Sequence, residues 1–526
     1  MTNEETEKLC AKQAEQITIL TQQVEWLKRQ LFGRKSERLD HPDLFEGSDD
    51  VGAGKSSAPP ADQAAEEGGN KNGNGDPGDE LPKEKRKTRA AKLPENLPVI
   101  VVEQVPSDVQ DDPEKWRRIG EEASEQIEKE PGYFYVRRTI RPKYVPVDEP
   151  HRAPIISPAQ PRMIENGFYG SALLTEILCN RYLYHLPYYR QAQLNHQRFG
   201  VELDTNTMGD AAAKVGEQCA LLCRRMKVSM LAGGHIQADE TAIRYLDPTS
   251  AGGSSQGYFW VYRAPGGDVI FDWQTSREHR HLREWLGPDY EGVIQSDGYA
   301  AYVSYLEWAR RRGKKLSRAA CLAHIRRKFK EALAERPATV RWILKIIRQL
   351  YEIEDGLRRN KASRAERKRV RQNNSRYRID LLRKSIDHLL TKSIRPKSRL
   401  GLALRYALGQ WPAMETYLGD GQVEIDNNLI ENSIRPSAVG KKNWLFIGSA
   451  EAGDRGAVIY SLLLSARAHG ADPQAYLKAV IEKLPSRKSD DIDDLLPENW
   501  ARANRGAHPY REPKRATARR ERRAAA

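Results

Sequence analysis

The chain has 526 residues, of which 86 are Lys or Arg and 72 are Asp or Glu, so its formal charge is +14. This length is too great for one small domain and predicts about three or four folded units. The basic excess indicates a polyanionic partner, for which nucleic acid is the usual candidate. Five cysteines are too few and odd in number for a disulfide framework. No apolar run approaches the roughly 18 residues of a membrane helix, so we expect a cytoplasmic protein without a membrane partner.

The first segment, residues 1–45, carries a heptad-like pattern. Apolar residues separated by three and four positions form an a/d seam, which predicts a coiled coil and self-association. The seam consists of Cys10, Ile17, Leu20, Val24, Leu27 and Leu31, with Gln13 as a polar exception near its start. The alternative is a single amphipathic helix docked on its own chain.

Three further segments precede the first long strand pattern. Residues 46–92, which include "GNKNGNGDPGDE", contain almost no large apolar residue and read as a disordered linker. Residues 93–160 contain short strand-like pieces and prolines, and predict a small strand-containing module. Residues 161–232 read as helical, with a glycine turn before a second helix that opens at Thr205 or Thr207. This order is compatible with a helix-turn-helix that contacts DNA, but any helical hairpin would look similar.

The period changes after residue 233. The stretches "HIQADETAIRYL", "GYFWVYRA", "DVIFDWQT" and "GVIQSDGYAAYV" are strand-like, and a helical piece separates the third from the fourth. Three meandering strands, a helix and a further strand form the opening order of a ribonuclease-H-like α/β fold. We therefore predict the first part of such a core, a mixed sheet with flanking helices, over residues 233–330.

Three acidic residues stand out by position. Asp239 lies in the first of these strands and Asp297 ends the fourth, in the similar contexts "IQADE" and "IQSDG". A single Asp at a strand end is usually a turn former, and the repeated context weakens that reading without removing it. Glu431 lies in a predicted helix within residues 421–450, where Asn428 and Arg435 share its face if Asp426 or Asn427 caps the helix.

Three carboxylates in one cleft would repel one another, at roughly 4 kcal/mol per pair for a separation of about 4 Å and an effective dielectric near 20. Such a cluster persists when protons or cations neutralise it, and carboxylates with water are the ligands that Mg²⁺ or Mn²⁺ prefers. Two such ions activate an attacking oxygen and stabilise a leaving one. The neighbouring polar residues would then meet DNA. These predicted DNA contacts are Asn428, Arg435, Lys441, Lys442, Arg326, Arg327 and Lys328.

The span between the second and third acids is longer than a bare core needs. Residues 331–420 predict a helical insertion, and residues 356–400 hold sixteen Lys or Arg against three acids, which suits a track for the DNA backbone. Residues 451–486 read as one or two closing helices, and residues 487–526 as a basic, disordered tail.

Cys321 and His324, three residues apart on a predicted helix, could be two metal ligands. Without a second pair nearby, a packing role is the favoured reading, as it is for Cys219 and Cys223.

Several of these stretches together resemble the transposases of the insertion sequence 66 family, which belong to the DDE group. The resemblance runs from about residue 20 to 485, and the stretches that carry it are "LKRQLFGRKSERL", "HLPYYRQ", "ADET", "SDGY", "CLAHIRRKF" and "DNNLIENSIRP…GKKNWLFIGS". It implies a ribonuclease-H-like catalytic core with a triad of Asp239, Asp297 and Glu431, which are both catalytic residues and ligands of two Mg²⁺ or Mn²⁺ ions. It also implies cleavage at the element ends by an activated water, followed by attack of the freed 3′-hydroxyl on target DNA.

One departure from the family pattern concerns zinc. Family members commonly carry two Cys pairs in the region that corresponds to residues 105–150, where this chain has no cysteine. Structural zinc needs four nitrogen or sulfur ligands, so we expect no zinc there.

The alternative function is a catalytically silent DNA-binding protein derived from a transposase. A ribonuclease-H-like nuclease that hydrolyses DNA without joining it is a third reading. The expected partners are DNA, a second copy through the coiled coil, and small companion proteins of the same element, with nucleoid association when DNA is bound.

Overall fold

The computed structural model describes residues 97–130, 132–148 and 151–510, which all fall in the second of the chain's two units. The predicted coiled coil (1–45) and linker (46–92) lie outside the described residues. Among the helices that the model describes, none is long and apolar enough to cross a membrane.

A small sheet forms the first part of the described chain. Its strands have the order β1-β3-β2, β4 also pairs with β3, and the elements are β1 (Val99–Glu103), α2 (Ser107–Asp111), η1 (Pro113–Lys115), β2 (Trp116–Glu130), β3 (Tyr133–Pro146) and β4 (Ile155–Ile156). The sequence did not predict β2, because its glutamates are poor strand formers. Cross-strand ion pairs offset this weakness: Arg138 lies 2.6 Å from Glu125, and Arg141 lies 2.8 Å from Glu122.

Three helices follow: α3 (Ser171–Tyr182), α4 (Tyr188–Phe199) and α5 (Thr205–Ala232). The glycine turn is present, since Gly200 ends α4 with a φ of 65°. The cap of α5 is Asp204, whose carboxylate accepts a 2.7 Å hydrogen bond from the backbone N–H of Thr207. Along α5 a buried apolar face includes Val215 and Leu222, and the helix contacts α15. DNA contact by this helical pair stays a prediction.

A mixed five-stranded sheet lies at the centre of the described unit. Its strands are ordered β7-β6-β5-β8-β9, with antiparallel pairing on the β5–β7 side and parallel pairing of β5, β8 and β9. The elements are β5 (His235–Leu246), β6 (Ser254–Arg263), β7 (Val269–Gln274), α6 (His279–Leu286), β8 (Gly292–Ser296), α7 (Ala300–Arg310) and β9 (Leu316–Ala320). The predicted mixed α/β class is confirmed. Two details differ: β9 was not predicted, and residues 300–303 begin α7 instead of extending the fourth strand.

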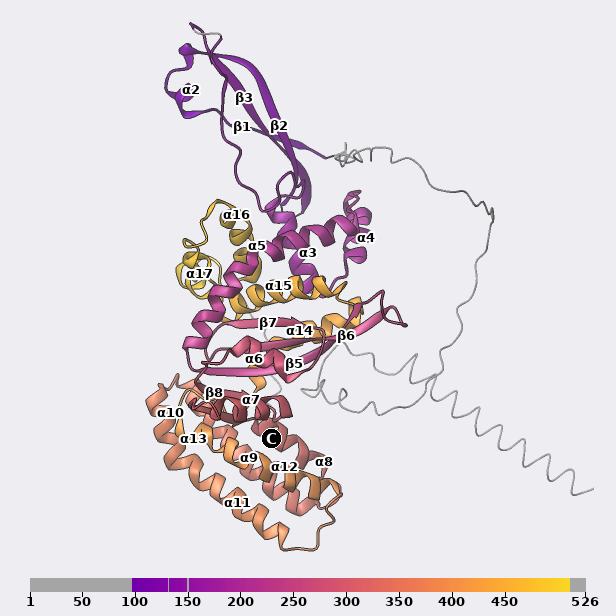
Figure 1. Cartoon of the computed structure of the whole chain (residues 1–526), viewed down its shortest axis with the longest axis vertical. Helices are drawn as coiled ribbons and strands as arrows, with labels where there is room; N and C mark the ends of the chain where they lie inside the picture. Colours follow the sequence, from indigo (N-terminus) through magenta and orange to yellow (C-terminus); the bar gives the residue numbers. More distant parts are fainter. Residues whose placement is uncertain (1–96, 131, 149–150, 511–526) are drawn as a thin grey trace, which may run out of the picture. The chain divides into compact units, whose positions relative to one another are not determined.

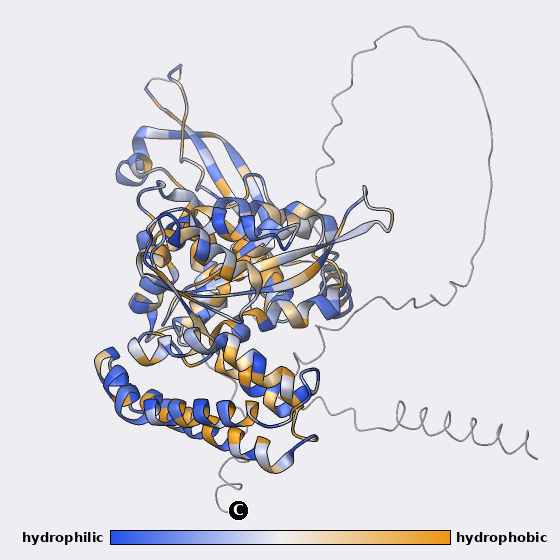
Figure 2. Cartoon of the chain, turned by 60° about the horizontal axis from the view of Figure 1, so that its bottom comes forward, coloured by the Kyte–Doolittle hydropathy of each residue, from blue (hydrophilic) through white to orange (hydrophobic). Residues whose placement is uncertain are grey.

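The predicted insertion is helical and has a core of its own. Its elements, with the preceding helix α8 (Leu322–Glu331), are α9 (Pro337–Arg359), α10 (Arg364–Val370), η2 (Arg371–Ser375), α11 (Arg376–Leu390), α12 (Arg399–Met414) and α13 (Thr416–Gly419). Apolar residues on one face of each long helix pack together, among them Ile343, Leu350, Leu382 and Leu404. Figure 2 shows hydrophobic and hydrophilic positions alternating along these helices, as expected for amphipathic helices around a shared core.

The chain closes with α14 (Asn428–Trp444), α15 (Ala450–Ala468), α16 (Pro473–Lys483), η3 (Leu484–Ser486), η4 (Asp493–Leu495) and α17 (Pro497–Asn504). Helix α15 covers the edge strand β7 (Figure 1), and the hydroxyls of Ser461 and Ser465 each accept a 2.8 Å bond from a β7 backbone N–H. Residues 487–510 differ from the predicted disordered tail. They contain α17, because Trp500 is buried and its ring lies 5.5 Å from that of Tyr476.

Candidate active site

The parallel pairing of β5 and β8 determines where the two aspartates lie. Gln237 on β5 is paired with Gln295 on β8. Asp239 lies two residues further along β5, and Asp297 follows directly after β8 ends at Ser296. Both residues are half-buried. The two predicted aspartates therefore lie near each other, close enough for the charge of Asp297 to act on Asp239.

The start of α14 is attached to these same two strands by buried amide side chains. Gln237 donates a 3.1 Å hydrogen bond to the carbonyl of Asp426, and Gln295 donates a 2.7 Å bond to the carbonyl of Glu424. The amide of Asn427 points back to the carbonyls of Ala238 and Gln295 at 3.4 and 3.5 Å. The loop before α14 is thus hydrogen-bonded to the strand ends that carry Asp239 and Asp297.

Glu431 lies in the first turn of α14, where its backbone N–H bonds the carbonyl of Asn427 at 3.0 Å. Its Oε1 is buried and has no hydrogen-bond partner among the described residues. His324 Nδ1 is 3.9 Å from this oxygen, and the positive charge of Arg327 acts on the carboxylate. Glu431 therefore turns inward, with an oxygen that lacks a hydrogen-bond donor.

The electrostatics of the acids reflect their proximity. Burial, followed by the charges of Glu240, Asp297 and Glu431, raises the pKa of Asp239 well above its usual value. Burial also raises the pKa of Glu431, with Asp426 and Asp297 adding to the increase and Arg327 opposing it. Mutual repulsion of this kind is expected for carboxylates gathered in one place, and a bound cation would relieve it.

Glu240, which sequence reasoning did not single out, is a fourth acid at this site. Its carboxylate accepts a 2.9 Å bond from Arg277 Nε and a 2.8 Å bond from the hydroxyl of Tyr302. The guanidinium of Arg277 stacks 3.9 Å from the ring centroid of Tyr299, whose backbone N–H bonds Asp297 Oδ1 at 2.9 Å. This set of contacts links Glu240 to the loop that carries Asp297. The only sequence signal was its adjacency to Asp239.

Gly298 shapes the loop between these acids and Tyr299. Its φ of +104° lies in a region that L side chains rarely adopt, and a Cβ there would lie 2.7 Å from Gln410 Nε2. The hydroxyl of Tyr406 also donates a 2.7 Å bond to the carbonyl of Asp297. The "SDGY" turn is thus held by the helical insertion as well as by the sheet.

The predicted DNA-contacting residues on α14 fall into two groups. Arg435 is half-buried on the face of Glu431, and its side chain makes no hydrogen bond or ion pair within the described part of the chain. Lys442 is exposed. By contrast, Lys441 donates a 3.0 Å bond to the carbonyl of Ala242, and Asn428 Nδ2 donates a 2.7 Å bond to Asp426. The last two side chains are thus bonded to the protein itself.

The three basic residues of α8 differ in their exposure and in the groups that they contact. Arg326 is exposed, and Lys328 lies 3.6 Å from Glu331. Arg327 is half-buried and faces the acids, with its Nη2 at 3.4 Å from His324 Nε2. Of the three, Arg327 is therefore the one beside the site.

Three side chains of types that can coordinate a metal ion lie close together where α8 and α14 begin. One ligand atom of each of Cys321, His324 and Glu431 lies within 4.8 Å of the other two. Cys321 is buried, and its sulfur accepts a 3.2 Å hydrogen bond from the backbone N–H of Asn427. The sequence interpretation separated the Cys–His pair from Glu431, because more than a hundred residues lie between them.

The acids fit a divalent cation by their chemistry. Asp239, Asp297 and Glu431 are half-buried, repel one another and offer hard carboxylate oxygens, and Glu431 Oε1 has no hydrogen-bond donor within the described part of the chain. Hard oxygen ligands of this kind suit Mg²⁺ or Mn²⁺.

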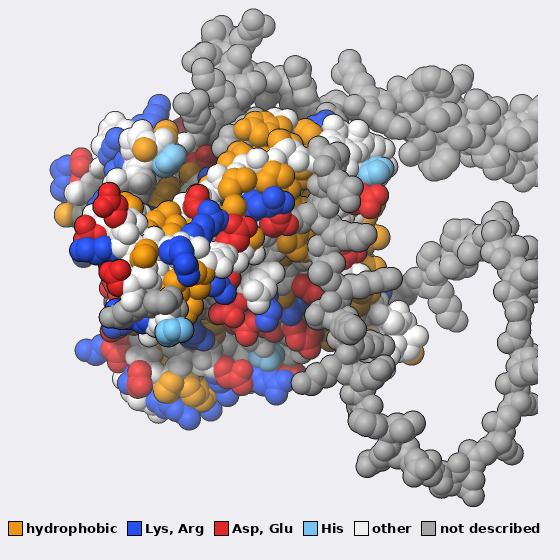
Figure 3. All heavy atoms as spheres, turned by 90° about the horizontal axis from the view of Figure 1, so that it is seen from above, with side chains coloured by type: hydrophobic (Ala, Val, Ile, Leu, Met, Phe, Trp, Pro, Cys, Tyr) orange, Lys and Arg blue, Asp and Glu red, His pale blue; other side chains and the backbone are white. Residues whose placement is uncertain are grey.

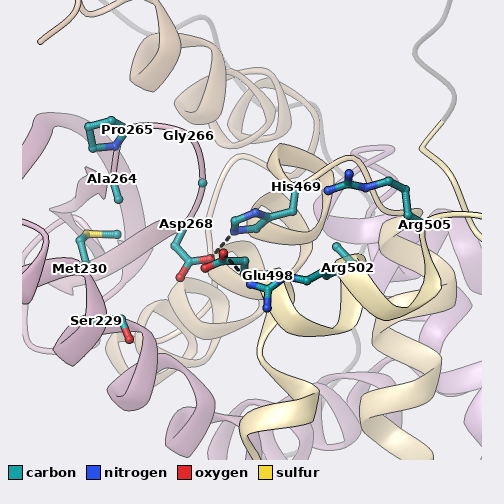
Figure 4. A pocket seen from close by; sticks show the side chains of 12 residues that line it. Ser229, Met230, Ala264, Pro265, Gly266, Asp268, His469, Glu498, Arg502 and Arg505 are labelled. Atoms are coloured by element: carbon teal, nitrogen blue, oxygen red, sulfur yellow. Dashed lines mark hydrogen bonds and ion pairs between the residues drawn. The ribbon is translucent and has the colours of Figure 1, made fainter. Parts of the chain in front are cut away.

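A pocket elsewhere in the unit does not contain these residues. It lies at the β6–β7 turn beside α17, and four of its charged side chains are already paired: Asp268 with His469 at 2.9 Å, and Glu498 with Arg502 at 2.9 Å (Figure 4). None of the predicted site residues lines it. We therefore place the candidate site at the partly exposed acids and not in this pocket.

Comparisons with known proteins match most of the chain. The family model "Transposase IS66 family" matches residues 166–455, "IS66 C-terminal element" matches 461–497, and "Transposase C of IS166 homeodomain" matches 19–102. Two similar proteins come from Sinorhizobium fredii (strain NBRC 101917 / NGR234). "Uncharacterized protein y4jD" is 32% identical over 401 residues, or 73% of this chain and 76% of that protein. "Uncharacterized protein y4qI" is 31% identical over 397 residues, or 73% and 72% respectively. These matches confirm the resemblance that the motifs predicted.

Proposed function

Because the chain belongs to the IS66 family of transposases, we propose that it cleaves DNA at the ends of an insertion sequence and joins the freed 3′-hydroxyl to target DNA. The observation that carries this proposal is the attachment of the start of α14 to β5 and β8, together with the effect of the Glu431 charge on Asp239 and of the Asp297 charge on Glu431. The strand order β7-β6-β5-β8-β9, with its antiparallel half followed by parallel strands, supports a ribonuclease-H-like core.

The three acids are proposed to hold two Mg²⁺ or Mn²⁺ ions. When bound, such ions supply activation of the attacking oxygen and charge stabilisation of the leaving oxygen in a phosphodiester displacement. The chain's own residues position this chemistry. Gln237 and Gln295 fix the start of α14 on the strands, and Gly298 allows the turn that presents Asp297.

The cationic residues beside the acids are proposed to hold the DNA. Arg435 projects from α14 one turn after Glu431 and has no partner among the described side chains. Its planar guanidinium suits a bidentate contact with a phosphate. Lys442, which is exposed, would extend this contact along the backbone.

The test is an in vitro assay with DNA that carries the element's terminal repeats, the full-length chain and Mg²⁺. Asp239→Asn removes a negative charge and a metal ligand at similar side-chain size. We expect cleavage and strand transfer to fall by more than roughly a hundredfold, since even outer-sphere partners of a metal contribute about 10- to 100-fold, while binding to the ends survives.

Asp272→Asn is the matched control, because Asp272 lies in β7 of the same sheet and takes no part in the site. This variant should cleave normally. Full cleavage by Asp239→Asn would remove Asp239 from the mechanism. End binding by the wild-type chain without turnover under Mg²⁺ or Mn²⁺ would favour the silent DNA-binding alternative, and cleavage without joining would favour a nuclease.

A further inference from the structure

We propose that Cys321, His324 and Glu431 form a separate binding site for a thiophilic divalent cation, for which Zn²⁺ is the best chemical match. The sulfur, one ring nitrogen and one carboxylate oxygen lie within 4.8 Å of one another. This donor set differs from the all-carboxylate set of Asp239, Asp297 and Glu431, with which it shares one residue.

The fold brings the three ligands together by joining two helix starts. Cys321 is the residue before α8 and His324 lies in its first turn, while Glu431 lies in the first turn of α14. The backbone N–H of Leu322 donates a 3.1 Å bond to the carbonyl of Ile425, which ties the two segments directly. The ligands therefore come from rigid, mutually bonded elements and not from a mobile loop.

Two backbone amides point at the sulfur of Cys321. Backbone amides of Asn427 (3.2 Å) and His324 donate to Sγ, and each amide belongs to the start of a helix. Amide donors and helix N-termini stabilise a sulfur anion. Burial, with the charges of Asp426 and Glu431, raises the pKa of the Cys321 thiol well above its usual value, so a cation that coordinates the sulfur has to displace the thiol proton.

Coordination requires the three ligand atoms, now within 4.8 Å of one another, to move closer together. Tetrahedral Zn²⁺ with bonds of about 2.0 Å to nitrogen and oxygen and about 2.3 Å to sulfur holds its ligand atoms roughly 3.3–3.6 Å apart. Here His324 Nδ1 and Glu431 Oε1 are 3.9 Å apart, and Oε1 is buried without a hydrogen-bond donor in the described chain. Coordination through Nδ1 places the ring proton of His324 on Nε2. Because a protonated Nε2 cannot accept a hydrogen bond, the 3.4 Å hydrogen bond from Arg327 Nη2 to Nε2 would be lost.

The ligand types separate this site from the magnesium site. Thiolate and imidazole favour Zn²⁺, whereas Mg²⁺ favours oxygen ligands alone. Three protein ligands and one open position also match the usual composition of non-structural zinc sites. If Glu431 is held by Zn²⁺, it is withdrawn from Asp239 and Asp297, so Zn²⁺ would inhibit DNA cleavage. This last consequence rests on the proposed function, but the site itself does not.

Cobalt(II) is the probe, because a thiolate bound to it gives a charge-transfer absorption in the near ultraviolet that oxygen ligands do not give. Tag-free, full-length protein without DNA or Mg²⁺ is titrated with Co²⁺. We expect the band to saturate at one ion per chain and to vanish on addition of Zn²⁺. Cys321→Ser should abolish it, and His324→Gln should weaken Co²⁺ binding by at least about tenfold.

Cys219→Ser is the matched control, since Cys219 is equally buried and lies on α5, outside the cluster. It should retain the band. The proposal is overturned if the wild-type chain shows no such band, or if the band survives Cys321→Ser. Because Cys321 is buried, circular dichroism of each variant is needed, and His324→Gln, whose side chain is 21% exposed, covers the case in which Cys321→Ser does not fold.

Inhibition is measured separately in the cleavage assay. Zn²⁺ should inhibit the wild-type chain, and Cys321→Ser should need at least about tenfold more Zn²⁺ for the same effect. Equal inhibition of both would overturn the link to Glu431. A wild-type chain that shows the cobalt band but never cleaves DNA would contradict the proposed function and leave the cation site standing.

Discussion

His235 shows how strongly a single buried group can make stability depend on pH. It opens β5 and is 2% exposed, and burial lowers its pKa to about 4, although Asp420, Glu424 and Gln295 oppose the shift and Arg364 adds to it. The unfolded chain has the ordinary histidine pKa near 6.5. Between these two values the unfolded state binds more protons than the folded state, so stability is lost as the pH falls from about 6.5 to about 4.

This difference predicts the behaviour of His235→Gln, which keeps a polar side chain but removes the titration. The wild-type free energy of unfolding should fall by up to about 3 kcal/mol more than that of the variant between pH 6.5 and 4, at about 1.4 kcal/mol per pKa unit. Chemical denaturation of both proteins across this range measures it. Parallel pH profiles would show that His235 titrates alike in the folded and unfolded states.

At the scale of elements, the insertion holds the segment that leads into α14. Arg371 is fully buried, forms two 2.8 Å hydrogen bonds with the carboxylate of Glu354, and donates to the carbonyls of Tyr417, Asp420 and Val423. Next to it, Glu424 accepts bonds from two further arginines of the insertion, Arg358 at 2.9 Å and Arg367 at 2.8 Å. Some of the basic excess predicted to track DNA is thus used inside the protein.

Arg371→Met is expected to destabilise the protein by about 3–5 kcal/mol, because it leaves the buried Glu354 carboxylate with only the longer, 3.4 Å contact to Arg367. Arg383→Met is the control on the same insertion, since its ion pair with Asp387 is exposed and should contribute no more than about 1 kcal/mol. Urea unfolding gives both values. Similar values for the two variants would mean that the buried network does not hold the insertion.

The sequence predicted those elements whose pattern is local. Alternation in "HIQADETAIRYL" predicted β5 with its observed bounds, and the repeated "IQxD" context marked Asp239 within β5 and Asp297 directly after its neighbour β8. β2 was missed because its stability comes from partners on β3. The contact of His324 with Glu431 and the burial of Arg371 were missed for a similar reason, since tertiary packing decides them and no local pattern records it.

At the scale of the whole molecule, the net charge of +14 does not make every face of the protein uniformly basic. On the face drawn in Figure 3, acidic and basic side chains are interleaved with exposed hydrophobic ones. DNA binding should therefore depend on particular lysines and arginines near the acids, and its salt dependence should report how many of them meet phosphate.

Two neighbouring lysines on α14 test this expectation. Lys442→Ala should reduce the slope of log K against log salt concentration for DNA binding by about 0.9, the value for one lost phosphate contact. Lys441→Ala should leave the slope unchanged and lower stability, because the ammonium of Lys441 bonds the carbonyl of Ala242. Fluorescence anisotropy with end DNA over a range of salt concentrations gives both slopes, and the reverse pattern would reassign the two side chains.

The central claim is that side chains from β5, from the end of β8 and from α14 share divalent cations. Anomalous diffraction from crystals of the full chain soaked in Mn²⁺ tests it most directly. The account predicts Mn²⁺ peaks within coordination distance of the carboxylates of Asp239, Asp297 and Glu431. Mn²⁺ bound elsewhere, with these three carboxylates bare at a saturating concentration, would contradict it.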